Sequence, residues 1–181
     1  GEVEGGILIN AQLEIKEKNF VINPSFEDDN RDMWIITHRN GTKPHTNFLY
    51  SSADAKSGNY SLHFYSDEAV DFQVEQTIVG LEPGYYNFSL FIQGGDAHNA
   101  EMYIFAKTNG DFYRSDTSVN GWINWSNPEI RGILVKDGTI TIGASIKADA
   151  GAWGTLDDFY LYKIADYEEE NNNIGNEGNE N

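Results

Sequence analysis

Cysteine is absent from the 181 residues of the chain. The absence excludes disulfide bonds, thiolate metal ligands and a cysteine nucleophile. It does not identify the compartment, because disulfides indicate an oxidising environment whereas their absence does not indicate a reducing one.

Basic residues are few: 12 Lys and Arg stand against 29 Asp and Glu, which gives a formal net charge of −17. Binding of nucleic acid depends on clustered Lys and Arg that contact phosphates. An acidic surface is also repelled by anionic membranes. The charge therefore argues against nucleic acid and against a membrane surface as partners.

Long apolar runs are also missing, since no segment approaches the roughly 20 apolar residues that a membrane helix needs. The chain does not open with a basic segment followed by an apolar one, so we expect any signal peptide to have been removed or to lie outside this sequence.

The residues that are abundant point to β-structure. The chain holds 10 Phe, 10 Tyr, 4 Trp and 18 Gly but only 4 Pro, a composition typical of β-proteins. Strict alternation of apolar and polar residues predicts strands, most clearly at Tyr85–Gln93 and Ile140–Ile146. About ten short strands at spacings of about 8 to 12 residues predict an all-β antiparallel sandwich, of the jelly-roll kind.

The expected organisation has three parts. Residues 1–18 form an N-terminal extension or edge strand, with weak alternation at Ile7–Ile15. Residues 19–164 form the β-sandwich, in which Phe20–Glu27 begins as a strand and ends in a turn at Pro24. Residues 165–181 are rich in Glu, Asn and Gly and are expected to be an acidic tail or linker.

Motifs for catalysis are not found. The sequence has no G-x-S-x-G elbow, no H-E-x-x-H and no Gly-rich phosphate loop. Several carboxylates could supply a pair for glycoside hydrolysis, but nothing in their spacing singles out two of them. The four histidines are scattered singly, as structural or solvated histidines usually are.

A calcium site has more support. In the final strand, Asp157 shares one face with Phe159 and Leu161, so its carboxylate points toward the core. A buried carboxylate needs a partner, and Ca²⁺ binds six to eight oxygens from carboxylates and carbonyls. Glu27 and Ser57 could meet Asp157 if the first and last strands lie side by side. Alternatively, Asp157 accepts hydrogen bonds from backbone N–H groups.

The tryptophans suggest a surface for sugars. Trp153 stands in a predicted loop of small residues, between two predicted strands, and has little local packing, so it is the strongest candidate for an exposed ring. Trp34 is expected in the core, and one of Trp122 and Trp125 is expected to be buried. Trp125 is included with Trp153 among the candidate sugar contacts. The polar candidates lie at strand ends or in loops: Gln93, Asp96, Asn99, Tyr113, Arg114 and Asn124.

Four segments together carry a resemblance to a known family. They are NPSFE, SGNYSLHFYS, LEPGYYNFSLFIQGGD and DGTITIGASIKADAGAWGTLDDFYLY. Between about Asn19 and Lys163 the chain resembles galactose-binding-like β-sandwich modules, and more narrowly the family 61 carbohydrate-binding modules of bacterial arabinogalactan endo-β-1,4-galactanases. NPSFE and the Asp-Asp pair are shared by several module families, whereas GGDAHNAEMYIFAK and IKADAGAWGTLDDF are narrower.

The resemblance implies a non-catalytic module that binds β-1,4-galactan and targets an attached endo-β-1,4-galactanase to it. It implies a secreted, monomeric module with one structural calcium, held by Glu27, a carbonyl in the turn Lys56–Asn59, and Asp157. The motif does not decide between Asp157 and Asp158, and the inward phase of Asp157 favours the former. The alternative functions are a jelly-roll polysaccharide-degrading enzyme fragment and a structural or adhesive sandwich domain.

Overall fold

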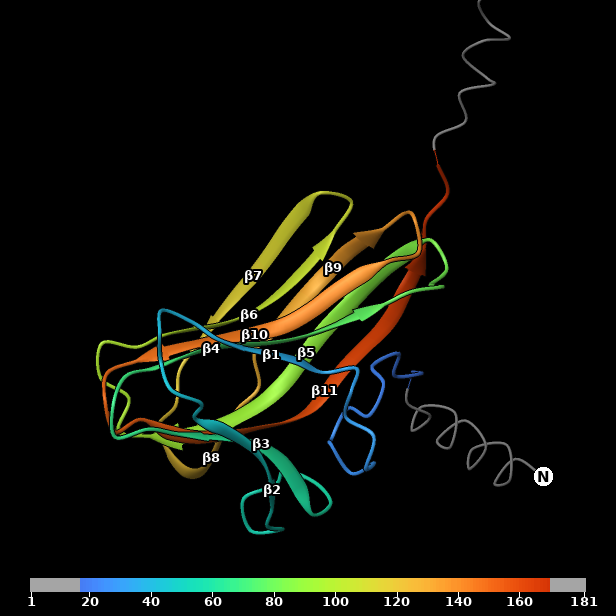
Figure 1. Cartoon of the computed structure of the whole chain (residues 1–181). Coiled ribbons are helices and arrows are strands. Elements are labelled where there is room, and N and C mark those ends of the chain that lie inside the picture. The colour runs from blue at the N-terminus through green and yellow to red at the C-terminus, as the bar shows by residue number, and fades with distance from the viewer. Residues whose placement is uncertain (1–16, 170–181) are drawn as a thin grey trace, which may run out of the picture.

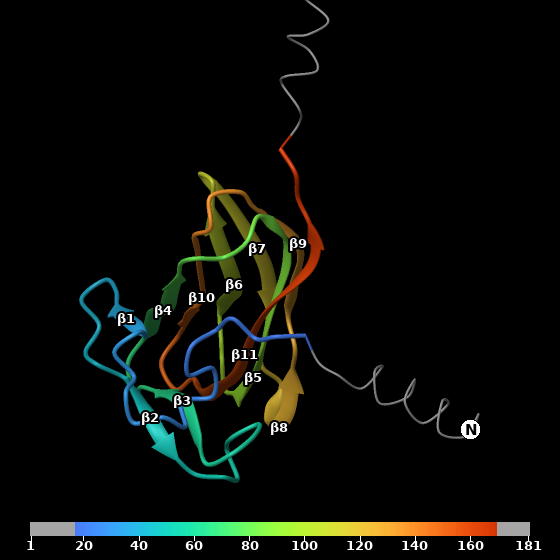
Figure 2. The same cartoon turned by 90° about the vertical axis from the view of Figure 1, so that its right-hand side faces the viewer.

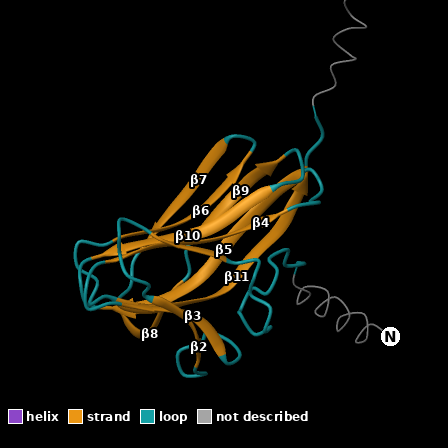
Figure 3. Cartoon of the chain, in the orientation of Figure 1, coloured by secondary structure: helices purple, strands orange, loops and turns teal. Residues whose placement is uncertain are grey.

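The computed structural model describes residues 17–169, which form eleven strands joined by loops (Figures 1 and 3). The strands are β1 (Ile35–His38), β2 (Thr46–Tyr50), β3 (Tyr60–Tyr65), β4 (Val70–Ile78), β5 (Gly84–Gly95), β6 (Glu101–Thr108), β7 (Asp111–Thr117), β8 (Gly121–Ser126), β9 (Glu129–Val135), β10 (Ile140–Ala148) and β11 (Trp153–Asp166). The described residues contain no helix that could cross a membrane.

Two antiparallel sheets face each other, as the two views of the chain show (Figures 1 and 2). The first sheet has the strand order β1-β4-β10-β6-β7. The second has the order β2-β3-β11-β5-β8, with β9 also paired to β5. The predicted all-β antiparallel sandwich is therefore confirmed.

The core lies between the sheets and follows the alternation seen in the sequence. In β10, Ile140, Ile142, Ala144 and Ile146 are all buried. Trp34 is buried as predicted: its indole Nε1 donates to the carbonyl of Asn23 at 3.0 Å, and its ring lies 4.6 Å from that of Phe159.

The segment Phe20–Glu27 differs from its prediction, because it forms bends and turns and no strand. Asn23 and Phe26 both have positive φ, at 51° and 63°, a conformation incompatible with an extended strand. The segment instead follows the edge of β11 through single bonds, from Phe20 N to Leu161 O and from Phe159 N to Pro24 O. The turns bring the Glu27 carboxylate to the backbone N–H groups of Asn59 and Tyr60, where β3 begins.

Parts of the expected three-part organisation fall outside the described residues. The possible strand at Ile7–Ile15 and residues 170–181 of the expected tail lie outside them. At the other end of the sandwich, β11 runs to Asp166, past the boundary expected at residue 164.

Gly143 in β10 provides a test of how closely the first sheet is packed. A Cβ atom at this position would lie 2.1 Å from the carbonyl oxygen of Val74 and 2.7 Å from Cζ of Phe105. We therefore expect Gly143→Ala to lower the free energy of unfolding by about 1–3 kcal/mol. Urea denaturation measures this, with Thr141→Ala on the same strand as a control expected to change it by only about 0.5 kcal/mol. Equal stability of Gly143→Ala and the wild type would contradict the packing described.

Candidate functional site

Trp153 is held at one end of the second sheet as the first residue of β11. It pairs with Gly95 in β5 and with Tyr65 in β3. The absence of a side chain at Gly95 lets the indole lie over that strand, because a Cβ there would be 2.8 Å from Cζ2 of Trp153. The ring thus belongs to a strand and not to the loop in which the sequence placed it.

A hydrogen bond to Asp96 fixes the orientation of the Trp153 ring. Its indole Nε1 donates a hydrogen bond of 2.9 Å to Oδ2 of Asp96, an exposed residue in the left-handed conformation with φ of 52°. The ring is half-buried, so it is fixed in orientation while part of it remains open to solvent. A fixed ring of this kind loses little conformational entropy when it binds a flat apolar surface.

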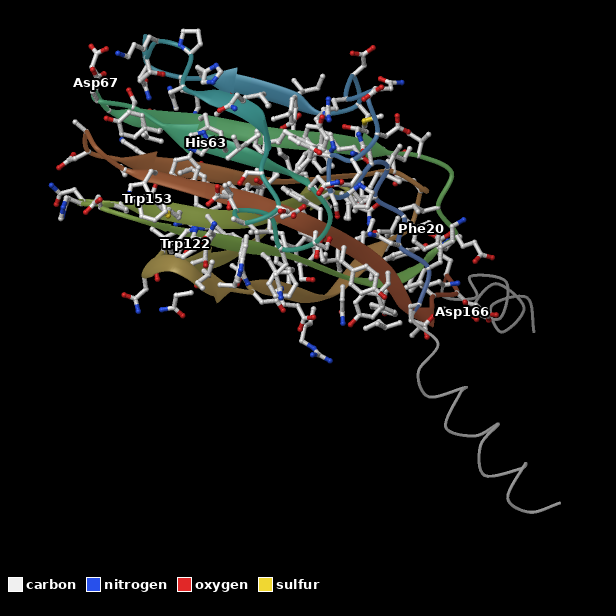
Figure 4. The ribbon with its side chains drawn as sticks, turned by 90° about the horizontal axis from the view of Figure 1, so that it is seen from below. Phe20, His63, Asp67, Trp122, Trp153 and Asp166 are labelled. Carbon is white, nitrogen blue, oxygen red and sulfur yellow. The ribbon has the colours of Figure 1, made fainter. Side chains whose placement is uncertain are left out.

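Trp122 in β8 is a second ring at the same end, and its place in the site was not predicted from the sequence. It is 54% exposed, and its Nε1 donates to Oδ1 of Asp54 at 2.9 Å. Figure 4 shows Trp122, Trp153 and His63 near one another at this end of the molecule. Of the pair Trp122 and Trp125, it is Trp125 that is half-buried, in edge-to-face contact with Phe91 at 6.5 Å. We call Trp153, Trp122 and Tyr65 the aromatic end.

Gln93 lies beneath this surface rather than on it. It is 1% exposed, and its Nε2 donates to Oγ1 of Thr155 at 2.9 Å and to the carbonyl of Asp54 at 3.3 Å. Its Oε1 accepts the N–H of Ile123. Thr155 in turn donates to the same Asp54 carbonyl at 2.8 Å. The structure therefore gives Gln93 a supporting position, in which it fixes the β2–β3 loop and β8.

The remaining candidates for sugar contact are divided between surfaces. Asn124 is exposed in β8 and donates to the carbonyl of Asn120 at 3.0 Å. Asn99 lies in the β5–β6 loop and donates to Oδ2 of Asp149 at 2.7 Å. Tyr113 and Arg114 lie on β7, in the first sheet, and therefore do not join the aromatic end.

Arg114 belongs to a separate group on the outer face of the first sheet. Its guanidinium lies 3.8 Å from the centroid of the Tyr103 ring and bonds to Asp116 at 2.8 Å. A small cavity of about 190 Å³ beside it is lined by Arg39, Tyr103 and Ser145, among others. This face is a competing location for a sugar, because it too combines a ring with planar polar groups.

The three candidate metal ligands converge on one turn. Glu27 accepts the N–H groups of Asn59 and Tyr60 at 2.9 and 2.8 Å. Asp157 is 0% exposed and accepts those of Lys56 and Ser57 through Oδ2, at 2.9 and 3.3 Å. The turn has room for the Glu27 carboxyl only because residue 58 is a glycine, with φ of +64°.

Asp158 takes part in the same group from the neighbouring position. Its Oδ1 accepts hydrogen bonds of 2.5 Å from the hydroxyls of both Ser25 and Ser57. Its own N–H donates to Oδ1 of Asp157 at 2.8 Å. Burial, followed by the charge of Asp158, raises the pKa of Asp157 to about 7.

These residues fit a hard cation in their chemistry, since the carboxylates of Glu27, Asp157 and Asp158 and the hydroxyls of Ser25 and Ser57 gather around one turn. The charge of Asp157 also lacks a cationic partner in this set. Among residues 17–169, however, no three acidic or imidazole groups are arranged so as to hold a metal. The sequence also left open that Asp157 accepts hydrogen bonds from the backbone. The structure shows this, because Asp157 accepts hydrogen bonds from three backbone N–H groups. Calcium therefore stays a prediction.

The raised pKa of Asp157 predicts how stability depends on pH in the presence of EDTA. Between pH 3.8 and about 7 the folded state keeps a proton that the unfolded state releases, so stability should fall as the pH rises through this range. The loss is at most about 4 kcal/mol, since each pKa unit corresponds to about 1.4 kcal/mol. Urea denaturation of the wild type and Asp157→Asn at several pH values measures it. If the difference between the two proteins does not change with pH, the raised pKa is wrong.

Comparison with solved structures shows what the chain is similar to. TmCBM61, a family 61 carbohydrate-binding module solved in complex with β-1,4-galactotriose, is 29% identical, with a TM-score of 0.73. The match covers 81% of this chain and 99% of that module. This confirms the resemblance to family 61 that the motifs indicated. Protein-family models and curated proteins gave no match.

Two further structures show the fold alone. The CBM22-1 xylan-binding domain of Paenibacillus barcinonensis Xyn10C is 16% identical with a TM-score of 0.54, over 84% of this chain and 97% of that domain. Tailspike protein 4 of bacteriophage CBA120 is 13% identical with a TM-score of 0.63, over 81% of this chain and 21% of the tailspike chain. The β-sandwich is thus one that carbohydrate-binding modules share.

Proposed function

Because the chain is similar to a family 61 carbohydrate-binding module over nearly the whole of that module, we propose that it is a non-catalytic module that binds β-1,4-galactan. The similar module was solved with β-1,4-galactotriose. One observation on this chain supports the proposal most strongly. The half-buried Trp153 ring lies over Gly95, which has no side chain, and a hydrogen bond to Asp96 holds it in place.

The aromatic end offers the groups that a galactose unit requires. The apolar C–H face of a pyranose stacks on the Trp153 indole, while its hydroxyls donate to nearby carboxylates and amides. Both indole N–H groups are already bonded to carboxylates, Trp122 to Asp54 and Trp153 to Asp96. The rings therefore contribute stacking surface, and the carboxylates accept hydrogen bonds from the sugar.

The binding should be modest in affinity. A few stacked rings at about 1 kcal/mol each have to offset the loss of conformational freedom of a flexible chain. Modest affinity suits a module that keeps a linked enzyme near a polysaccharide, since the module has to release and rebind as the enzyme degrades its substrate. We accordingly propose that the module is secreted and monomeric and that its parent chain carries an endo-β-1,4-galactanase.

Trp153→Ala tests the location of the site. We expect the mutation to weaken galactotriose binding at least fivefold, equivalent to about 1 kcal/mol, because it removes the stacking surface. Isothermal titration calorimetry measures the affinity.

The matched control is Phe112→Ala, which removes a ring that is 55% exposed on β7 of the first sheet. This variant should bind like the wild type. Loss of binding in Phe112→Ala together with normal binding in Trp153→Ala would move the site to the face that carries Arg114.

We also propose that Glu27, the turn Lys56–Asn59 and Asp157 bind one calcium ion. The support is the convergence of these residues and the raised pKa of Asp157, which a cation would lower again. The ion would neutralise the buried carboxylate and tie the N-terminal segment to the last strand. Its role would be structural, since it would hold the fold and not contact the sugar.

Thermal unfolding tests the calcium proposal. Calcium at a hundredfold excess over its Kd should raise Tm by about 5–10 °C relative to EDTA, because the ion binds only the folded state. Asp157→Asn should abolish this rise, whereas Asp137→Asn in the exposed turn between β9 and β10 should keep it. A wild-type Tm that is the same in calcium and in EDTA would refute the proposal.

A further inference from the structure

A groove of about 570 Å³ lies further along the second sheet from the aromatic end. Its lining includes Phe91 and Ser89 of β5, Tyr160 and Tyr162 of β11, and Asn127 and Glu129 beyond β8. The groove was not among the candidate sites, because the residues that line it come from segments far apart in the sequence.

The groove and Trp153 lie on the same face of the sheet. In the pairing of β5 with β11, Trp153 stands opposite Gly95, Asp157 opposite Phe91 and Tyr160 opposite Ser89. The irregularity between Asp157 and Tyr160 shifts the alternation by one residue, so that Phe159 and Leu161 are buried in the core and Tyr160 and Tyr162 point outward. Asp157 therefore lies on the outer face and not, as the sequence predicted, on the face of Phe159 and Leu161. In Figure 4, β11 runs from Trp153 at one end of this face toward Asp166 at the other.

The two tyrosines form a prearranged aromatic surface. Their rings stack with centroids 4.6 Å apart and planes 21° from parallel, and both side chains are half-buried. The Tyr160 hydroxyl donates to the carbonyl of Glu17 at 2.9 Å, and the Tyr162 hydroxyl accepts from Nδ2 of the buried Asn87 at 3.0 Å. Rings fixed in this way bind at low entropic cost.

Aromatic side chains connect the two locations. Phe91 lines the groove and contacts Trp125, which lies three residues after Trp122 on β8. Lys56 lies at the border, with Nζ 4.8 Å from the centroid of the Phe91 ring. The β2–β3 loop covers Gln93, Thr155 and Asp157 between the two locations. A chain stacked on Trp153 therefore has to reach the tyrosines beside this loop, along Trp125 and Phe91.

The charges of the groove restrict what can occupy it. Its acidic lining residues are Glu17, Glu129 and Asp158, and neither Lys nor Arg is part of the lining. An anionic polysaccharide such as a polyuronate would be repelled, whereas a neutral sugar can donate its hydroxyl hydrogens to these carboxylates. The combination of stacked rings with acidic acceptors favours neutral hexose units.

We propose that this groove binds further sugar units of the same neutral polysaccharide chain that stacks on Trp153. The inference rests on the proposed function and extends it: affinity rises with the length of the galactan chain, because a longer chain reaches Tyr160 and Tyr162. A galactotriose at the aromatic end does not need the tyrosines.

Calorimetry with galactotriose and galactohexaose on the full chain tests the groove. The wild type should bind the hexaose at least about fivefold more tightly than the triose. Tyr162→Ala should lose this gain while it binds the triose as the wild type does. Tyr162→Phe, which keeps the ring and removes only the hydroxyl, should retain the gain.

The outcomes separate this inference from the proposed function. Unchanged hexaose affinity in Tyr162→Ala would overturn the inference and leave the function intact. Equal weakening of triose and hexaose would also overturn it, because the tyrosines would then belong to the first sugar site. Absence of triose binding by the wild type would refute the proposed function itself. A hexamer of galacturonic acid that binds as tightly as galactohexaose would overturn the assignment of a neutral ligand.

Discussion

The position of β11 between β3 and β5 is the constraint on which the rest of the structure depends. The approach is unusually close at Gly94 and Gly154, where a Cβ atom would lie 2.1 Å from the carbonyl of Trp153 and 2.3 Å from that of Gln93, respectively. This pairing sets Trp153 at the end of the sheet, places Asp157 beneath the turn Lys56–Asn59 and aligns the two tyrosines on the outer face. The positions of the aromatic end, of the carboxylates around the turn Lys56–Asn59 and of the groove therefore all depend on the register of β11.

Carboxylates serve two different purposes around this strand. Asp54 and Asp96, at the surface, orient indole rings through their N–H groups and keep the rings in place for stacking. Glu27 and Asp157 bind the backbone of the turn at residues 56–60 and join segments that are distant in the sequence. The strongly acidic composition argues against nucleic acid as a partner. Some of its carboxylates instead hold segments of the fold together, and others form a surface suited to neutral ligands.

Much of the fold could be predicted, because alternation in single strands reports directly which side chains face the core. The burial of Trp34 and of alternate residues in β10 followed from this pattern. The face of Asp157 did not, because a register shift after Asp157 puts its side chain on the outer face, opposite to Phe159 and Leu161, where the turn Lys56–Asn59 buries it. The site could be predicted only in part, because it depends on register between strands. Tyr65 and Trp122 come near Trp153 through the pairing of β3 and β8 with their neighbours, which no local pattern reveals. Gln93 was predicted to contact the sugar because it lies near a strand end. The β2–β3 loop covers this residue, so its side chain is buried.

The central place of the last strand has a consequence for how the chain acquires its structure. Since β11 lies between β3 and β5, the second sheet stays divided until residues 153–166 have been synthesised. Glu27 and Asp157 likewise meet the same turn only after both ends of the domain have come together. Contacts between such distant segments form slowly, and a nascent chain lacks them altogether. The sandwich is therefore expected to fold after its synthesis is nearly complete, and not strand by strand as it emerges.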